Sequence, residues 1–483
     1  MITVAQIPTL TPLLIVTAGA VGLLLMCATR RSPGLAAAWT IAALLMAAIS
    51  TRWVDAADRQ VTPLLIMDNY SLFYLGLMFL ATAATAALSH VYWRNRPEPV
   101  EEYHVLLLCA ALGTGVIVAS THFVSFFIGL ELLSVSLYAM IAYSRRSEPG
   151  TEAALKYLVL AAGSASFLLF GMALVYAETG TMYFMRLAVE RPPAGGTDHA
   201  VFIIGLSLMV AGLGFKLALV PFHLWTPDVY EGAPAPVTAF VASVSKGAVF
   251  AFLLRYFVLI DVHAYPNLAL AFAVIAVASM FTGNLLALRQ NNVKRLLAYS
   301  SIAHLGYLLV AFLSSGPLAT VAIAFYLAAY FVTSLGAFGV IAVLSRAGRE
   351  PERIDDYRGL FWRRPWVAGV FIAMLLSLAG IPLTAGFIGK FYIVAAGAQS
   401  AQWILVFALV ANSAIGLFYY LRVFLAIIAD PPDEKDPAAA LPPVDGTGAS
   451  ILACLVSALV LLGVYPGPFI EWAQRIVSPL VAP

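Results

Sequence analysis

The sequence predicts an all-α polytopic membrane protein with about 14 transmembrane helices. Of its 483 residues, 62% are hydrophobic and 11% are charged, whereas soluble domains carry about 25% charged residues. The apolar runs reach about 20 residues, the length at which a helix crosses roughly 30 Å of hydrocarbon. They are continuous and lack the alternating pattern of a membrane β-barrel. Helices are therefore expected across the whole membrane.

The expected helices follow one another with short loops, and the chain divides into four parts. Residues 1–102 are expected to form helices 1–3, residues 103–260 helices 4–8, residues 261–428 helices 9–13, and residues 429–483 a cytoplasmic loop and helix 14. The apolar runs centre near Val16, Leu44, Leu77, Ala111, Leu133, Leu168, Leu208, Phe250, Val274, Leu309, Ala329, Leu375, Leu409 and Leu459.

Two of the expected helices contain a break. The stretch Val201–Tyr230 would be about 45 Å long as one straight helix, too long for an untilted span. Pro221 lies inside it and lacks the N–H that an uninterrupted helix needs. The stretch Trp366–Ala396 likewise places Gly380 and Pro382 in the middle of an apolar run. Each break is expected to interrupt a helix within the membrane.

Paired broken helices are typical of transporters built from inverted repeats. Unwound backbone at that depth is tolerated only where it lines protein or a water-filled cavity. Residues 103–260 and 261–428 each contain one broken helix. Because each unit has an odd number of helices, five, the two units are expected to have opposite topology.

Basic residues collect in alternate loops, which predicts the orientation of the chain. The loops expected at the cytoplasmic face carry Arg30, Arg31, Arg94, Arg96, Arg145, Arg146, Arg289, Lys294, Arg295 and the arginines from Arg346 to Arg364. The opposite loops carry little beyond Arg52, Arg59, Arg186 and Arg191. The positive-inside rule therefore places both termini on the periplasmic side of a bacterial inner membrane.

Four charged side chains lie inside apolar runs, namely those of Glu131, Lys216, Lys246 and Lys390. Lys246 is ten residues past Pro236, roughly 15 Å along a helix and near the bilayer midplane. Glu131 is eight residues into its helix, at about 12 Å. Lysine can reach the interface only from near a helix end, so these charges are expected to face a cavity or a partner.

Glu131 and Lys216 form the expected pair of opposite charge. A neighbouring carboxylate favours a charged lysine while burial favours a neutral one, so a small movement of Glu131 would change whether Lys216 holds its proton. A static ion pair that fixes helix packing is the alternative. Lys246 and Lys390 have no carboxylate at the same depth, which favours a proton relay for the set.

Three further residues are candidates for the proton route. His304 lies about ten residues into its helix, beside Ser300, Ser301, Tyr299 and Tyr307, and imidazole both donates and accepts protons. His223 is expected at the cytoplasmic interface, and Lys156 at the inner boundary of its helix. For His223, a turn that anchors the helix end is an equally good interpretation.

Other kinds of site are not indicated. Cys27, Cys109 and Cys454 lie in apolar runs without CxxC spacing or a nearby histidine cluster, which indicates neither a disulfide framework nor a metal site. No glycine-rich phosphate loop follows a strand. The net charge of +2 suggests no polyanionic partner such as a nucleic acid.

Several motifs carry a family resemblance. They are FKLALVPFHLWTPDVYEGAPAPVTAFVASVSK (Phe215–Lys246), IGLELLSVSLYAM, NNVKRLLAYSSIAHLGYLLV and LAGIPLTAGFIGKFY. Together they resemble the subunit N family of bacterial NADH-quinone oxidoreductase, respiratory complex I, over about residues 64–422. The form TPDVYEGAPAPVTAF, the lysine at position 390 and the end of the chain after helix 14 each favour this family over its larger paralogues.

The resemblance implies a function and a set of site residues. It implies that Glu131 and Lys216 are the coupled pair of a first half-channel, that Lys246 is the connecting lysine, and that Lys390 lies at the outward half. His304 lies where the family has an intramembrane histidine in the second repeat. It implies no cofactor in this chain, with FMN, iron–sulfur clusters and quinone in other subunits. The implied partners are sister antiporter-like subunits, small membrane subunits, the lipid bilayer and protons.

Two other functions remain open alternatives. The chain could belong to a multisubunit cation/proton antiporter, or it could be a structural scaffold of a membrane arm. A sodium path should show oxygen ligands clustered at depth, yet Glu131 is the only deep carboxylate. Scaffolding does not require deep lysines without counter-ions. The expected function is therefore proton translocation coupled to electron transfer from NADH to quinone.

Overall fold

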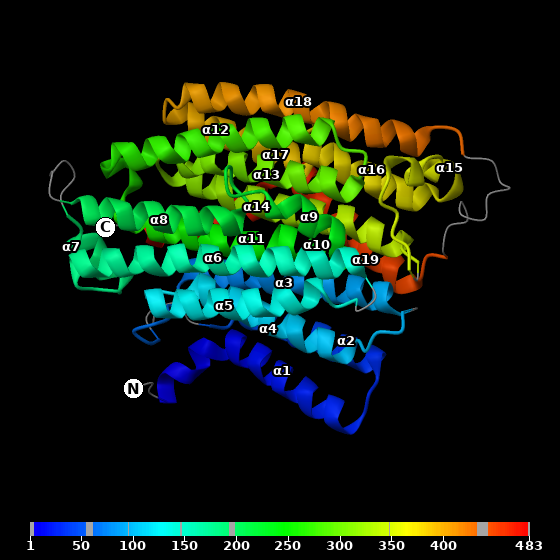
Figure 1. Cartoon of the computed structure of the whole chain (residues 1–483), viewed down its shortest axis with the longest axis horizontal. Coiled ribbons are helices and arrows are strands. Elements are labelled where there is room, and N and C mark those ends of the chain that lie inside the picture. The colour runs from blue at the N-terminus through cyan, green and yellow to red at the C-terminus, as the bar shows by residue number, and fades with distance from the viewer. Residues whose placement is uncertain are drawn as a thin grey trace.

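The computed structural model describes residues 4–54, 61–94, 96–144, 147–192, 199–346, 348–431 and 443–481. Within these ranges the chain forms long helices that run side by side along the long axis of the molecule, and it contains no β-strand (Figure 1). Thirteen helices are long and apolar enough to cross a membrane, and Pro365–Ala379 is a shorter apolar helix. Every helix centre predicted from the sequence falls inside an observed helix, so the predicted fold class is confirmed.

The helices follow the predicted order along the chain. The N-terminal part contains η1 (Val4–Leu10), α1 (Thr11–Thr29), α2 (Pro33–Ser50) and α3 (Asn69–Trp93). The next part contains α4 (Glu101–Ala119), α5 (Phe123–Ile141), α6 (Glu148–Thr179), α7 (Phe184–Glu190), α8 (Ala200–Leu217), α9 (Trp225–Gly232), α10 (Ala235–Phe240), η2 (Val241–Ser245) and α11 (Lys246–Ile260).

The second half of the chain repeats this succession of long helices. It contains η3 (Val262–Ala264), α12 (Pro266–Leu288), α13 (Val293–Phe312), α14 (Pro317–Leu344), η4 (Ile354–Tyr357), α15 (Leu360–Arg363), α16 (Pro365–Ala379), α17 (Ala385–Gln399) and α18 (Trp403–Ile428). The last helices are α19 (Gly446–Val464) and α20 (Gly467–Val481). The division into two inverted units, residues 103–260 and 261–428, stays a prediction.

Local sequence explains where several helices begin. Asp68 accepts a hydrogen bond from the Ser71 N–H at the start of α3, and Asn292 accepts from two N–H groups at the start of α13. Ser147 and Thr384 cap α6 and α17 in the same way. These side chains satisfy backbone donors that have no partner inside the helix.

The first break forms where Pro221 predicts it. α8 ends at Leu217, and Ala218 then adopts a left-handed conformation with φ of 59°. α9 resumes at Trp225, whose indole N–H donates to the Phe215 carbonyl at 2.9 Å and so joins the two pieces. The Val220 N–H in the gap donates to the Ser279 hydroxyl at 3.0 Å. The freed backbone groups therefore have partners within the protein, as a membrane interior requires.

The second break also forms where it is predicted. α16 ends at Ala379, and Gly380 turns the chain with φ of 86°, a conformation that glycine adopts without strain. α17 then begins at Ala385, where the Gly386 N–H donates to the Ser377 hydroxyl at 3.0 Å. Lys390 lies on α17, and Lys216 lies in the last turn of α8. Each break therefore places a lysine next to a helix end inside the bundle.

The centre of the bundle is formed by α14 and by the continuous helix α10–η2–α11. The helix α10–η2–α11 is completely enclosed, and α14 almost completely. α14 packs against α3, α10, α16, α17 and α19, so it contacts helices from both halves of the chain. In Figure 1 α1 and α18 lie on opposite sides of the bundle, with α14 between them. The buried lysines lie around this centre.

Loops rich in arginine meet at one end of the bundle, called here the arginine-rich end. Arg31 pairs with Glu102 at 2.9 Å, and Arg94 with Asp445 at 2.6 Å. Arg96 donates to the carbonyl oxygen of Arg346 at 2.8 Å. These loops were predicted to share one face of the membrane, and the contacts confirm that they lie together. Arg59, Arg145, Arg146 and most of the segment PPDEKDPAAALPPVDG lie outside the described residues.

Candidate functional site

Lys216 lies at the end of α8, where the first break begins. Its side chain is buried, with 5% exposed, and its ammonium donates to the Ser134 hydroxyl at 2.7 Å. Glu131 lies one turn before Ser134 on α5, and its Oε1 atom is shielded from solvent without a hydrogen-bond partner. A direct ion pair was expected between Glu131 and Lys216. Among the described residues neither side chain forms an ion pair within 4.0 Å, and the Lys216 ammonium contacts the Ser134 hydroxyl instead.

Lys246 is the first residue of α11, and it follows the break between α8 and α9 along the chain. The π-helical turn η2 precedes it, and such turns occur often at functional sites. The ammonium of Lys246 is 1% exposed and donates to the Ser301 hydroxyl at 2.6 Å. It also lies 5.2 Å from the centre of the Tyr230 ring and 5.9 Å from that of Trp225.

Aromatic rings connect the surroundings of the first two lysines. Lys216 lies 5.5 Å from the Tyr157 ring, and Tyr157 lies 4.9 Å from the Trp225 ring that faces Lys246. Such rings attract an ammonium group through their negative faces. Ser134 and Ser301 accept hydrogen bonds from the two ammonium groups. The aromatic rings between the two lysines partly compensate for the hydration that these charges lose.

His304 is held by two tyrosines in the core of α13. Its Nδ1 atom lies 2.6 Å from the Tyr326 hydroxyl and its Nε2 atom 3.2 Å from the Tyr420 hydroxyl. Tyr420 in turn hydrogen-bonds to Ser300, next to the Ser301 that accepts from Lys246. A cavity of about 10 Å³, lined by His304 and Tyr326 among others, offers room for about one water. The imidazole can therefore accept on one side and donate on the other.

Lys390 points back from α17 at the open end of α16. Its ammonium donates to the carbonyl oxygens of Leu378 at 3.1 Å and Ala379 at 2.8 Å, and to the Ser413 hydroxyl at 2.9 Å. The negative end of the α16 dipole favours a cation at this place. Tyr307, which follows His304 by one turn, has its ring 5.2 Å from Lys390.

These contacts arrange the predicted residues in one row across the bundle. Glu131 and Lys216 stand at one end, Lys246 and His304 in the middle, and Lys390 at the other end. The residues between them are hydroxyl-bearing or aromatic side chains rather than carboxylates. A row of this kind can pass protons between groups that both bind and release them.

Several residues of the row were not singled out by sequence reasoning. Ser134, Tyr230, Tyr326, Tyr420 and Ser413 each contact one of the predicted groups. Their signal in the sequence is weak, because serine and tyrosine are common in membrane helices. Ser134 could have been found, since it follows Glu131 by three residues and so shares its helix face.

His223 lies in the break between α8 and α9. α9 continues the chain for eight residues beyond the break before it ends at Gly232, near the arginine-rich end. The His223 side chain is buried, with 7% exposed, and its expected place at the cytoplasmic interface stays a prediction. Lys156 is exposed and pairs with Asp228 at 2.8 Å and with Glu152 at 2.7 Å.

The described residues contain no group of three or more histidine, cysteine, aspartate or glutamate side chains placed to hold a metal ion. Cys27 and Cys109 are partly buried and Cys454 is exposed, and none of the three forms a disulfide.

Comparison with known proteins gives matches over nearly the full chain. The family model described as "NADH:quinone oxidoreductase/Mrp antiporter, TM" matches residues 120–416. The NADH-quinone oxidoreductase subunit N of Nitrosospira multiformis is 50% identical over 478 residues, which cover 96% of this chain and 94% of that protein. The subunit N of Methylococcus capsulatus is 46% identical, with 97% and 95% covered.

Solved structures show the same architecture. A chain of respiratory complex I from Thermus thermophilus with bound aureothin is similar with a TM-score of 0.81 and 32% identity, and 96% of this chain and 99% of that chain are covered. A chain of the Mrp complex from Dietzia has a TM-score of 0.85 at 21% identity, with 98% and 97% covered. At that identity the second likeness concerns the fold alone.

Proposed function

Because this chain belongs to the NADH:quinone oxidoreductase/Mrp antiporter family of membrane subunits, and its curated relatives are subunit N of NADH-quinone oxidoreductase, we propose how its buried residues translocate protons. The protein is a proton-translocating, antiporter-like subunit of that enzyme complex, and other subunits of the complex are its partners. It is a multi-span membrane protein of the respiratory chain.

The proposed path has two halves that meet at Lys246 and His304. Glu131 and Lys216 control uptake in the first half, and Lys390 releases protons in the second. The observation that carries this proposal is the hydroxyl contact of each buried amine: Lys216 to Ser134, Lys246 to Ser301 and Lys390 to Ser413. A buried ammonium without a counter-charge is costly, so a lasting static role would favour a carboxylate partner instead.

The position of Ser134 suggests how the first pair works. Glu131 lies one turn from Ser134 and changes the field at the hydrogen bond between Lys216 and Ser134, so its distance decides whether Lys216 holds its proton. A neutral lysine can then accept a proton again. Electron transfer in other subunits would drive the cycle by resetting Glu131 and Lys216 in turn.

The rest of the complex supplies what this chain does not carry. FMN, iron–sulfur clusters and quinone belong to other subunits in this proposal, and sister antiporter-like subunits and small membrane subunits adjoin this one. The membrane is the bacterial inner membrane, with both termini periplasmic and the arginine-rich end cytoplasmic. The excess of arginine at that end supports this orientation.

Replacement of Lys216 tests the proposed function. In inverted membrane vesicles, Lys216→Ala is expected to reduce the initial rate of NADH-driven proton pumping at least tenfold, because Lys216 and Glu131 together control proton uptake into the path. NADH oxidation is measured in the same vesicles, and assembly of the complex on a native gel.

Lys156→Ala is the matched control. It also removes a lysine from the first half of the chain, but one in exposed ion pairs, which contribute little to stability. It should assemble and pump at close to the normal rate. Normal pumping by an assembled Lys216→Ala complex would reduce the buried lysine to a packing residue.

A further inference from the structure

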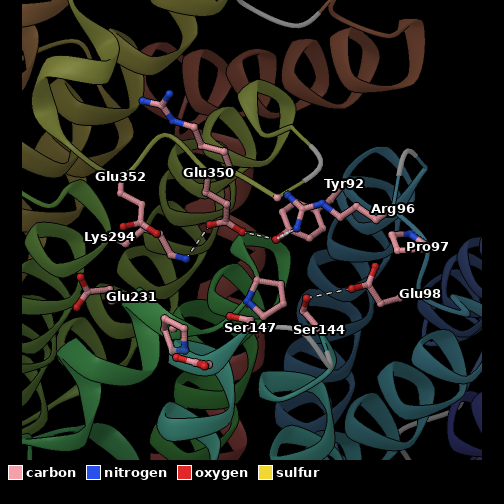
Figure 2. A pocket seen from close by; sticks show the side chains of 16 residues that line it. Tyr92, Arg96, Pro97, Glu98, Ser144, Ser147, Glu231, Lys294, Glu350 and Glu352 are labelled. Atoms are coloured by element: carbon pink, nitrogen blue, oxygen red, sulfur yellow. Dashed lines mark hydrogen bonds and ion pairs between the residues drawn. The ribbon is translucent and has the colours of Figure 1, made fainter. Parts of the chain in front are cut away.

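A polar cavity opens at the arginine-rich end, apart from the row of buried lysines. Its volume is about 680 Å³. Figure 2 shows that the end of α3, the loop before α6, the junction of α9 and α10, the start of α13 and the loop before η4 all contribute to its wall. We refer to it as the end cavity. Its lining includes Tyr92, Arg96, Glu98, Ser144, Lys294 and Glu350.

A buried ion pair closes the base of the end cavity. The Lys294 ammonium lies 2.7 Å from the Glu350 carboxylate, and their side chains are 1% and 10% exposed. Glu350 also accepts from the Tyr92 hydroxyl (Figure 2) and from the Ala235 N–H. Burial opposes ionisation of Glu350, but Lys294 outweighs it and the pKa of this carboxyl is lower than usual. The carboxylate is therefore charged at rest.

A buried pair like this contributes little to stability, because the cost of removing two charges from water offsets their attraction. Its position is more informative than its energy. Lys294 also donates to the carbonyl oxygen of Ala233 at 2.7 Å, just before α10 begins. It would thus keep one partner if Glu350 became neutral. The pair can open without leaving a bare buried ammonium.

A row of hydroxyl groups leads from this pair into the membrane along α3. Tyr92, Ser89, Thr85 and Thr82 follow one another at spacings of three or four residues, so they share one helix face. All four are buried. The row spans about 15 Å, and neighbouring hydroxyls are one turn apart. Ser89 and Thr85 donate to the carbonyl oxygens four residues earlier in α3, and Ser89 also hydrogen-bonds to the Tyr103 hydroxyl.

The inner end of the row lies near the segment of chain that carries Lys246. The Thr82 hydroxyl donates to the Met78 carbonyl one turn further along α3. The Met78 side chain lies 3.2 Å from where a Cβ atom on Gly247 would be, next to Lys246 in the chain. α3 also packs against α10 and η2, which carry the chain from the end cavity to this lysine.

We propose that the end cavity is the entrance through which protons reach the row of buried lysines, and that Glu350 takes them up. The proposal rests on the proposed function. A hydronium ion in the end cavity gives its proton to the Glu350 carboxylate and becomes water, and the ion pair with Lys294 opens. The proton passes inward along the hydroxyls of α3 to the neutral amine of Lys246, each hydroxyl turning from its backbone acceptor to accept one proton and donate another through a bridging water. After it has passed on its proton, Glu350 is a carboxylate again and pairs with Lys294.

A reversible block of the end cavity tests this entrance after the complex has assembled. Ser144→Cys is introduced after Cys27, Cys109 and Cys454 have been replaced. Inverted vesicles are then treated with a membrane-impermeant methanethiosulfonate, which reaches the arginine-rich end from the bath if that end is cytoplasmic. Proton pumping and NADH oxidation are compared in the same vesicles before treatment, after treatment and after a reductant has removed the reagent.

The reagent is expected to lower pumping at least fivefold, and the reductant to restore it. Asp355→Cys is the matched control, because Asp355 is exposed at the same end but does not line the end cavity. Unchanged pumping by a fully labelled Ser144→Cys complex would overturn the proposal. If Ser144→Cys is labelled only in vesicles of the opposite orientation, the cavity is on the wrong side and the proposal falls as well.

A second pair of variants addresses Glu350 itself. Glu350→Gln removes the acid but keeps the shape, and is expected to lower pumping at least fivefold, whereas Glu352→Gln at the cavity wall changes it less than twofold. The result separates the two proposals. Loss of pumping by Lys216→Ala together with normal pumping by Glu350→Gln would leave the proposed function in place and reject this entrance.

Discussion

At the scale of single residues, a serine separates the two charges that the sequence pairs. The apolar surroundings of Glu131 and Lys216 predict that both side chains need a partner, and that much follows from sequence. Which partner each finds depends on the rotation of α5 against α8, and packing sets that rotation. Ser134 therefore came only from the structure, although it shares a helix face with Glu131.

Ser134→Ala is expected to impair the first half of the path. It removes the acceptor of the Lys216 ammonium, and an unsatisfied buried donor costs about 1–3 kcal/mol. Pumping in inverted vesicles should fall several-fold with an assembled complex. Ser136→Ala on the same helix removes a hydroxyl that donates only to the Leu132 carbonyl, and should pump normally. Equal effects of the two variants would contradict a special role for Ser134.

The ion pair of Asp68 and Arg255 predicts a stability effect that depends on pH. Both oxygens of Asp68 contact the Arg255 guanidinium, at 2.8 and 3.1 Å. Burial raises the pKa of Asp68, but Arg255 and Ser71 outweigh this and hold it below its usual value of 3.8. A lowered pKa in the folded state means that the pair stabilises the protein above about pH 4, and that this is lost as pH falls further.

Asp68→Asn should therefore destabilise the protein at pH 7 by about 3–5 kcal/mol, because Arg255 is left buried and unpaired. The measurement is the thermal unfolding midpoint of the purified complex. The difference from the unmodified protein should shrink as pH is lowered below 4. Asp445→Asn, in a more exposed pair with Arg94, should cost at most about 1 kcal/mol. Equal midpoints for Asp68→Asn and the parent at pH 7 would contradict this account.

At the scale of helices, both breaks were predictable and the π-helical turn was not. Pro221 and the pair Gly380 and Pro382 are strong local signals, since they remove donors or permit a left-handed turn. The turn η2 arises in VASVS, a segment with neither proline nor glycine. A π-helical turn contains more residues than a turn of an α-helix. Here α3 and α14 pack around it, and no local sequence pattern predicts that packing. For the same reason Glu350 and Lys294 could not be paired from sequence, being 56 residues apart.

Gly380→Ala tests the second break. The new side chain would be strained at a φ of 86°, and its Cβ atom would lie 2.9 Å from Cδ of Lys390. Both effects should displace the ammonium from the carbonyl groups of α16, at a cost of about 1 kcal/mol or more, and pumping should fall several-fold. Gly369→Ala lies in the same helix with nothing within 4 Å of the added methyl, and should pump normally. If both variants behave alike, the geometry of the break has no bearing on transport.

At the scale of the whole molecule, the arrangement favours protons over sodium. Sodium requires several oxygen ligands around one point. Between Lys246 and Lys390 the described row offers amines, imidazole and hydroxyls, and no carboxylate forms an ion pair with either lysine. Replacing sodium by choline in the vesicle medium should thus leave the rate of NADH-driven pumping unchanged within about 20%. That tolerance is far smaller than the tenfold change in rate that corresponds to about 1.4 kcal/mol. A sodium-dependent rate would instead support the antiporter alternative.

The contact between Lys390 and the end of α16 couples a proton to the length of a helix. The last carbonyl groups of a helix lack partners within it, and the Lys390 ammonium occupies two of them. When the amine gives up its proton it loses a donor and its charge, so the final turn of α16 is held less firmly. Amide hydrogen exchange at Leu376–Ile381 should therefore be faster in Lys390→Met than in the parent complex. Unchanged exchange would mean that α16 is held by packing alone. If exchange is faster, each proton that passes through Lys390 also loosens and then restores the last turn of α16. Proton transfer is then coupled to a change in backbone structure at that point.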